Sequence, residues 1–193
     1  MRVVAYGFGM RSPVWRVGAA LAVLVAALAV GGCVDNEPDP TQSPDPSPTP
    51  LFESDEEALA AAEEAYGRYL LVNDQVFAEG GIGLERLDGV ATGQQLEADK
   101  ANLTELTGKG YRSVGTTTFE MLELQQTASD EMVGDPSVIA YVCEDVSGVD
   151  VVDSNGVSVV QSNRPNRVRF EVAFDGEPTE LRISERIPWE DPC

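Results

Sequence analysis

The spacing of apolar side chains changes near Tyr111, from a helical period to the alternation of strands. Between Leu59 and Phe77, apolar residues recur every three or four positions, as on the buried face of an amphipathic helix. The preceding Ser54-Asp55-Glu56-Glu57 is a capping box, with Ser54 as the N-cap and Glu57 reaching back. We therefore predict a first helix that ends at about Ala78, where a pair of glycines follows.

Two further helical segments are expected before the pattern changes. A short helical piece is predicted at Leu84–Val90, and a longer helix is predicted at Gln94–Thr107. The longer helix is followed by Gly108, which is a common residue just beyond a helix C-terminus.

The second half of the chain is predicted to form five or six antiparallel strands. Val138–Val142 is apolar on both faces, which indicates a central strand. Asp153-Ser154-Asn155-Gly156 lies between two apolar runs, and Asn-Gly in that setting predicts a hairpin. The predicted strands are Val114–Gln126, Val138–Val142, Val149–Val152, Val157–Val160, Arg167–Phe174 and Leu181–Ile187. Helices followed by strands predict an α+β fold, with N-terminal helices packed on one face of a curved antiparallel sheet.

The strand at Arg167–Phe174 has the clearest alternation in the chain. Its side chains at 168, 170, 172 and 174 are all apolar, whereas those at 167, 169 and 171 are charged. Because successive strand residues point to opposite faces, we expect the apolar set to face the core and the charged set to face away from it.

The N-terminus has the pattern of an export signal. Met1–Arg16 carries three arginines and no acidic residue, and Val17–Val34 has no charge. The alternative is an uncleaved membrane helix, because the uncharged run of 18 residues is at the lower limit for spanning a bilayer. In both cases arginines precede the apolar run and acids follow it, which places the remainder outside the cytoplasm.

A proline-rich spacer follows this apolar run. Residues 34–50 hold six of the twelve prolines and almost no apolar side chains. Such a segment cannot bury a core, so we expect a disordered or polyproline II stalk. A ligand for a proline-binding module is the alternative.

The end of the apolar run, Ala29-Val30-Gly31-Gly32-Cys33, resembles the lipobox of bacterial lipoproteins. The resemblance implies that the Cys33 thiol carries diacylglycerol and that the chain is cut just before it. It also implies a lipid-anchored protein on the outer face of the cytoplasmic membrane. The expected organisation is then a signal peptide at 1–32, a lipid-anchored linker at 33–52 and an α+β domain at 53–193.

Three cysteines fit the same compartment. If Cys33 takes the lipid, Cys143 and Cys193 remain, and an even pair in an exported protein predicts a disulfide. A loop of about fifty residues would contribute roughly 4 kcal/mol to stability. Two free thiols are the alternative, and a metal site is disfavoured because the spacing is wide and no other soft ligand is present.

The composition excludes several function classes. The 193 residues include 13 basic and 33 acidic side chains, for a net charge of −20, so nucleic acid is not an expected partner. The chain has no histidine, which excludes Ser-His-Asp and Cys-His catalysis and imidazole-bound metals. No Walker loop or complete dinucleotide fingerprint is present, and the acids around Asp145 and Asp153 lack the spacing of a calcium loop. We therefore expect no cofactor and no metal.

Short motifs spread over the domain resemble the NTF2-like (SnoaL-type) fold, as it occurs in actinobacterial lipoproteins. They are Ala62-x-x-Ala65-Tyr66, Val90-Ala91-Thr92-Gly93, Cys143-Glu144-Asp145, Val152-Asp153-Ser154-Asn155-Gly156, and Trp189 shortly before the terminal Cys193. The resemblance implies a cone-shaped sheet in a Gram-positive envelope lipoprotein, and members of this group generally have no known activity.

A cone of this kind can hold a pocket, so the resemblance also suggests pocket residues. The candidates are Tyr66, Tyr69, Tyr111, Phe119, Tyr141 and Asp145. Their alternative role is structural, with the aromatic rings filling the core and Asp145 in a turn. The preferred hypothesis is a non-catalytic envelope lipoprotein, anchored to the membrane through the diacylglyceryl cysteine, whose domain binds an envelope protein or a small apolar ligand. The alternative is an isomerase or hydratase that uses a buried carboxylate in the cone.

Overall fold

A computed structural model describes residues 50–127, 135–190 and 193, which belong to one compact unit from Pro44 to Cys193. The predicted signal peptide, the lipidation site at Cys33 and nearly all of the predicted linker lie outside these residues. Within the described part, none of the helices has the length and apolar character that a membrane span requires.

The helices follow the sequence prediction closely. Helix α1 is Asp55–Ala78, the 3₁₀-helix η1 is Leu84–Gly89, and α2 is Gly93–Gly108. The Ser54 side-chain oxygen accepts a hydrogen bond from the Glu57 backbone N–H at 3.2 Å, which confirms the predicted N-cap of α1.

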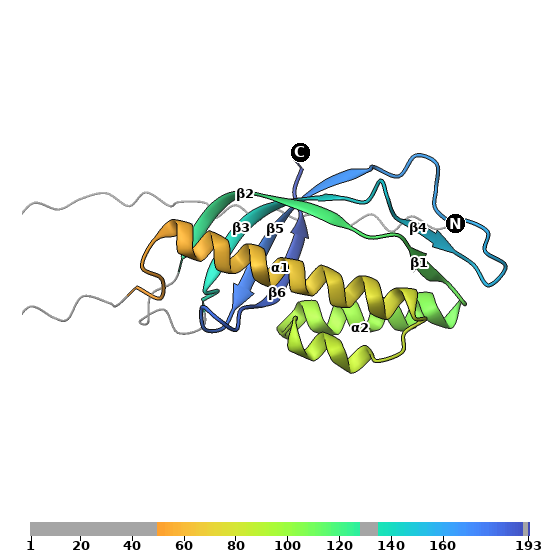
Figure 1. The fold of residues 1–193 in the computed structure, drawn as a ribbon, viewed down its shortest axis with the longest axis horizontal. Coiled ribbons are helices and arrows are strands. Elements are labelled where there is room, and N and C mark those ends of the chain that lie inside the picture. The colour runs from red at the N-terminus through yellow and green to blue at the C-terminus, as the bar shows by residue number, and fades with distance from the viewer. Residues whose placement is uncertain (1–49, 128–134, 191–192) are drawn as a thin grey trace, which may run out of the picture. The chain divides into compact units, whose positions relative to one another are not determined.

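Four strands form the main antiparallel sheet, and α1 runs across one of its faces (Figure 1). The strands are β2 (Thr118–Thr127), β3 (Val138–Asp145), β5 (Arg167–Asp175) and β6 (Arg182–Pro188), in the order β2-β3-β5-β6. The prediction that β3 is central is confirmed, since it pairs with β2 on one side and β5 on the other. Strands β2 and β6 are the sheet edges, so this sheet does not close into a barrel.

Alternation along β3 and β5 separates the two faces of this sheet. Phe170, Val172 and Phe174 of β5 lie in the hydrophobic core with the helices, together with the even-numbered apolar residues of β3. The expected orientation of β5 is therefore confirmed. On β3, residues of odd number point to the opposite face, which we call the outer face of the sheet.

The prediction of one sheet that includes a regular hairpin is wrong. Strands β1 (Arg112–Val114) and β4 (Asp150–Val152) pair with each other in a separate two-stranded sheet. The turn at 153–156 forms, but residues 157–160 make only an isolated bridge between Ser158 and Val152. Strand β4 pairs along its whole length with β1, almost forty residues earlier in the chain, and local turn signals do not contain that information.

The predicted single strand at 114–126 is divided into β1 and β2. Gly115 has a φ of +97°, a conformation that suits glycine, and a Cβ there would lie 2.0 Å from the Gly148 carbonyl oxygen. Just beyond it, the Asp74 carboxylate of α1 accepts hydrogen bonds from the Thr117 backbone N–H at 2.8 Å and from its hydroxyl at 3.0 Å. The break therefore allows the chain to bend where it is tied to the helix.

Candidate functional site

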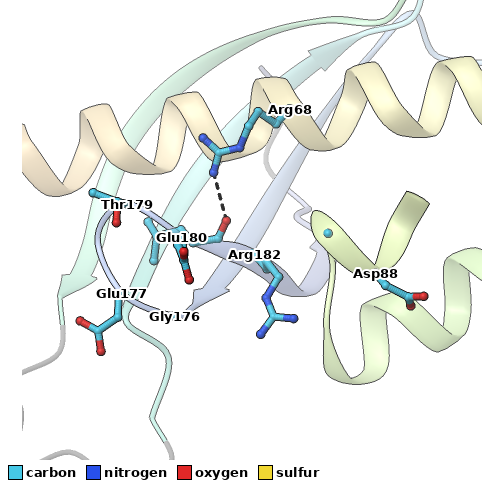
Figure 2. Close-up of a pocket in the computed structure, with 9 residues that line it drawn as sticks. Arg68, Asp88, Gly176, Glu177, Thr179, Glu180 and Arg182 are labelled. Carbon is cyan, nitrogen blue, oxygen red and sulfur yellow. Dashed lines mark hydrogen bonds between the residues drawn. The ribbon is translucent and has the colours of Figure 1, made fainter. Parts of the chain in front are cut away.

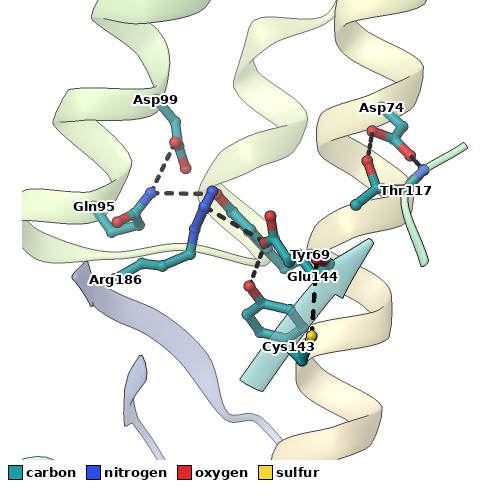
Figure 3. Close-up of polar contacts among 9 residues, drawn as sticks. Tyr69, Asp74, Gln95, Asp99, Thr117, Cys143, Glu144 and Arg186 are labelled. Atoms are coloured by element: carbon teal, nitrogen blue, oxygen red, sulfur yellow. Dashed lines mark hydrogen bonds and ion pairs between the residues drawn. The ribbon is translucent and has the colours of Figure 1, made fainter. Parts of the chain in front are cut away.

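A buried polar cluster lies between α1, α2 and the helix-facing side of the sheet (Figure 3). Glu144 of β3 is 5% exposed, and its carboxylate accepts a hydrogen bond from the Tyr66 hydroxyl of α1. The same carboxylate oxygen lies 3.5 Å from a guanidinium nitrogen of Arg186 on β6. The Arg186 guanidinium also stacks over the Phe170 ring at 4.0 Å. Glu144 is therefore a buried charge with both a hydrogen-bond donor and a cation beside it.

The second half of the cluster comes from α1 and α2. The Gln95 amide nitrogen donates to Asp99 Oδ1 at 2.8 Å and lies 3.2 Å from the Tyr69 hydroxyl oxygen. Asp99 is 9% exposed, and its Oδ2 has no hydrogen-bond partner among the described residues. Within the same part of the chain, Arg186 Nε also lacks a partner. Unsatisfied buried polar atoms are rare in proteins and mark this cluster as unusual.

Burial dominates the electrostatics of the cluster. Burial raises the pKa of the Tyr66 hydroxyl well above its usual value, and the Glu144 charge raises it further. Burial likewise raises the pKa of Tyr69, although Arg186 acts in the opposite direction. Both tyrosine hydroxyls are therefore neutral at neutral pH. Burial also raises the pKa of the Asp99 carboxyl, because removal from water disfavours the charged form.

Three clefts lie on the surface of the described residues, with volumes of about 780, 530 and 360 Å³. None of the side chains of the polar cluster lines any of these three clefts. A catalytic carboxylate needs contact with substrate, and Glu144 Oε1 contacts both Tyr66 and Arg186 instead. In the described residues, no three cysteine or acidic side chains converge in a way that could hold a metal ion. The geometry is that of an internal network that joins the helices to the sheet.

The outer face of the sheet carries the predicted cysteine pair. The Sγ atoms of Cys143 and Cys193 lie at disulfide distance, 2.12 Å, and their Cα atoms are 5.8 Å apart. Cys143 is buried and Arg167 Nε donates to its sulfur at 3.2 Å. The bond therefore attaches the last residue of the chain to the central strand.

The largest of these three clefts is polar, with a volume of about 780 Å³, and Figure 2 shows it between α1, η1 and the loop from β5 to β6. Arg68 and Arg182 line it together with three acids, Asp88, Glu177 and Glu180. Arg68 is already engaged, since it pairs with Glu64 at 2.7 Å and donates to the Leu181 carbonyl oxygen at 3.3 Å. Charges of both signs are mixed in this cleft, so it has no clear preference for one kind of ligand.

A second cleft, of about 530 Å³, is mainly apolar and lies where the end of α2 meets β4 and the segment after it. We call it the apolar cleft. Its apolar and aromatic lining consists of Leu106, Tyr111, Val151, Val159, Val160 and Pro165. Gln161, Asn163 and Arg164 complete the lining, and none of the nine lining residues is acidic.

The structure does not bring the six predicted pocket residues together. Tyr66, Tyr69 and Phe119 lie on the helix side, where the Tyr66 ring contacts the Phe119 ring edge-on at a centroid distance of 5.1 Å. These three rings pack in or against the core, which was their alternative, structural role. Tyr111 lines the apolar cleft instead.

The remaining two candidates, Tyr141 and Asp145, have odd numbers on β3 and therefore face away from the helices. Tyr141 packs against Trp189 at a centroid distance of 4.9 Å and beneath the Arg169 guanidinium at 4.3 Å. Hydrogen bonds from Ser147 lower the pKa of the Asp145 carboxyl, which accepts from the Ser147 backbone N–H at 2.8 Å. Asp145 is thus a turn residue, which was the alternative role given for it, and it does not lie in a cone.

Sequence reasoning missed the polar residues that do meet inside the domain, namely Glu144, Arg186, Gln95 and Asp99. The sequence did contain a signal for the burial of Glu144. Its even number places it on the same face of β3 as the buried Val138 and Val142. A comparable signal marks Asp99, which is three residues after Leu96 and four before Leu103 and so shares the apolar face of its helix.

Comparisons with known proteins give no family assignment. No protein-family model matches the chain, and no curated protein matches it. One solved structure that matches the chain is the crystal structure of the intermembrane space region of chloroplast protein ARC6, at 14% sequence identity and a TM-score of 0.47. The match covers 69% of this chain and 97% of that one.

Proposed function

We propose that the protein is a non-catalytic lipoprotein of the bacterial cell envelope. Cys33 anchors it to the outer face of the cytoplasmic membrane, and the domain from about residue 53 binds a small apolar ligand or another envelope protein. The finer description of the domain as NTF2-like is part of this proposal. Helices on one face of an antiparallel sheet are compatible with that fold.

The observation that carries the proposal is the pairing of the cysteines. Cys143 and Cys193 lie at disulfide distance, which leaves Cys33 as the one remaining cysteine of the chain. Disulfides persist in compartments outside the reducing cytoplasm. Cys33 follows an apolar run and two glycines, as expected for a lipidated cysteine. The domain and the N-terminus therefore point to the same compartment by independent signals.

The alternative, an isomerase or hydratase with a buried carboxylate, receives less support from the geometry. The domain does contain a buried carboxylate, Glu144. However, this group is bonded to Tyr66 and paired with Arg186, and it lines none of the three clefts described above. A protein that only binds a ligand does not need an acid or base that can reach a substrate.

The anchoring part of the proposal is tested by intact mass and by labelling. The full chain is expressed in a bacterial host that is fed an alkyne-tagged palmitate, and the membrane fraction is analysed. We expect a mature chain that begins at Cys33 and carries a diacylglyceryl group. Cys33→Ser should abolish both cleavage and labelling, whereas the matched variant Cys193→Ser should retain both.

An intact Met1 terminus with an unmodified Cys33 would overturn the anchoring proposal. Equal labelling of the Cys33→Ser and wild-type chains would do the same, because the label would then be attached elsewhere.

A further inference from the structure

The apolar cleft has the size and the chemistry of a ligand site. Its volume of about 530 Å³ lies within the range of about 300–1,000 Å³ that is usual for small-molecule sites. Six of its nine lining residues are apolar or aromatic. Val159 at its wall is 40% exposed, so apolar surface remains available to a ligand.

The charge of this cleft differs from that of the whole protein. The chain has 33 acidic and 13 basic residues, yet the cleft is lined by one guanidinium and no carboxylate. An acid-free wall with one cation is complementary to an apolar molecule that carries a single negative group. A cationic amphiphile would find no counter-charge there.

Arg164 is held in place but keeps donors for a ligand. Its Nη2 donates to the backbone carbonyl oxygens of Val146 at 2.9 Å and of Val149 at 2.7 Å. Within the described residues, neither Nε nor Nη1 makes a hydrogen bond to the protein. A guanidinium that is fixed on one side and free on the other can bind a carboxylate without first being ordered.

We propose that the apolar cleft binds a long-chain fatty acid, with the acyl chain against the valines and Tyr111 and the carboxylate on Arg164. This inference rests on the proposed function, since it identifies the small apolar ligand and gives its location. A protein that is anchored by its own lipid works beside a membrane, where acyl chains are available.

The test uses the anchored full chain in bacterial membranes and a photoactivatable palmitic acid. After illumination, the labelled peptides are mapped by mass spectrometry, with and without excess palmitate. We expect competable labelling at or beside the nine lining residues, which fall within 106–111 and 151–165. Labelling that maps elsewhere, or that palmitate does not reduce, would overturn the inference.

Two valines provide a matched pair of variants. Val159 lines the cleft, whereas Val157 is two residues away, is 61% exposed and does not line it. Val159→Asp places a negative charge against the acyl chain and the carboxylate, so labelling should fall at least tenfold. Val157→Asp adds the same charge nearby and should leave labelling unchanged. Both side chains are exposed, so both variants should fold, and an equal effect of the two would refute the site.

Changing the probe tests the role of Arg164 without disturbing its structural hydrogen bonds. A photoactivatable hexadecanol lacks the carboxylate and should label the cleft about tenfold less, since a charge-assisted hydrogen bond contributes roughly 1.5–3 kcal/mol. Equal labelling by the acid and the alcohol, or by a hexadecyl amine, would refute the assignment of the carboxylate to Arg164. Preferential labelling by a photoactivatable phospholipid would contradict the proposal that the ligand of the cleft is a free fatty acid.

The intact mass of the same samples separates this inference from the proposed function. Acylated Cys33 without competable labelling of the cleft would refute the cleft alone. Labelling of the cleft in a chain with unmodified Cys33 would refute the anchor and leave the cleft as a ligand site.

Discussion

The buried pair of Glu144 and Arg186 should be strongly coupled in folding stability. The side chains are 7% and 22% exposed, so each charge depends on the other rather than on water. Glu144→Gln keeps an oxygen that can accept from the Tyr66 hydroxyl but removes the negative charge. Arg186→Met removes the positive charge and retains a long side chain that can cover the Phe170 ring.

The magnitude follows from the burial of the pair. Removing one partner of a buried ion pair costs about 3–5 kcal/mol, because the other charge stays buried without compensation. We expect about 3 kcal/mol for each single variant, at the lower end of that range because Arg186 keeps some exposure. The double variant leaves neither charge and should also lose about 3 kcal/mol, rather than the roughly 6 kcal/mol of additive effects. The coupling energy is therefore about 3 kcal/mol.

Urea unfolding of the oxidised protein, followed by circular dichroism, measures this double-mutant cycle. The control is the same cycle at the exposed pair Glu105–Lys109, whose side chains are 67% and 50% exposed and which should show far weaker coupling. If the Glu144 and Arg186 variants each cost less than about 1 kcal/mol and their effects simply add, the reasoning from burial is wrong.

Three further outcomes follow from single sites. Cys193→Ser removes a disulfide with a sequence separation of 50 residues and should lower the free energy of unfolding by about 4 kcal/mol. In urea titrations, wild-type protein in reductant should have the same free energy of unfolding as this variant, and a difference between the two would contradict this account. Burial raises the pKa of Asp99 above its ordinary 3.8, so its contribution favours the native state below that value and is lost as pH rises through the folded pKa. Asp99→Asn should therefore be more stable than wild type at pH 7, and urea midpoints measured across pH would show the opposite order if the carboxylate is stabilising. Gly115→Ala places a Cβ 2.0 Å from the Gly148 carbonyl oxygen, so it should lower the melting temperature more than Gly80→Ala, which has a similar positive φ but no atom within 4 Å of the added Cβ.

Features of the fold that depend on residues close together in the chain could be predicted from the amino-acid sequence alone. The N-cap at Ser54 and the alternation in β5 are properties of a few consecutive side chains, and both are found in the structure. The apolar character of Val138–Val142 on both faces placed β3 at the centre, because only a strand covered on both sides can bury such a run. The pairing of Cys143 with Cys193 could be predicted once the lipobox resemblance had assigned Cys33 to the lipid, because two cysteines then remain.

The contacts among the polar residues inside the domain could be identified only from the packing of its elements. Tyr66 and Glu144 are 78 residues apart in sequence, and their contact depends on how α1 lies on the sheet. The pairing of β1 with β4 similarly depends on distant segments, and it overrode the local signal for a hairpin beyond Gly156. The apolar cleft joins Tyr111 to Arg164 across more than fifty residues. Periodicity fixes the direction in which each side chain points along its own element, but contacts between elements depend on packing that no local pattern specifies.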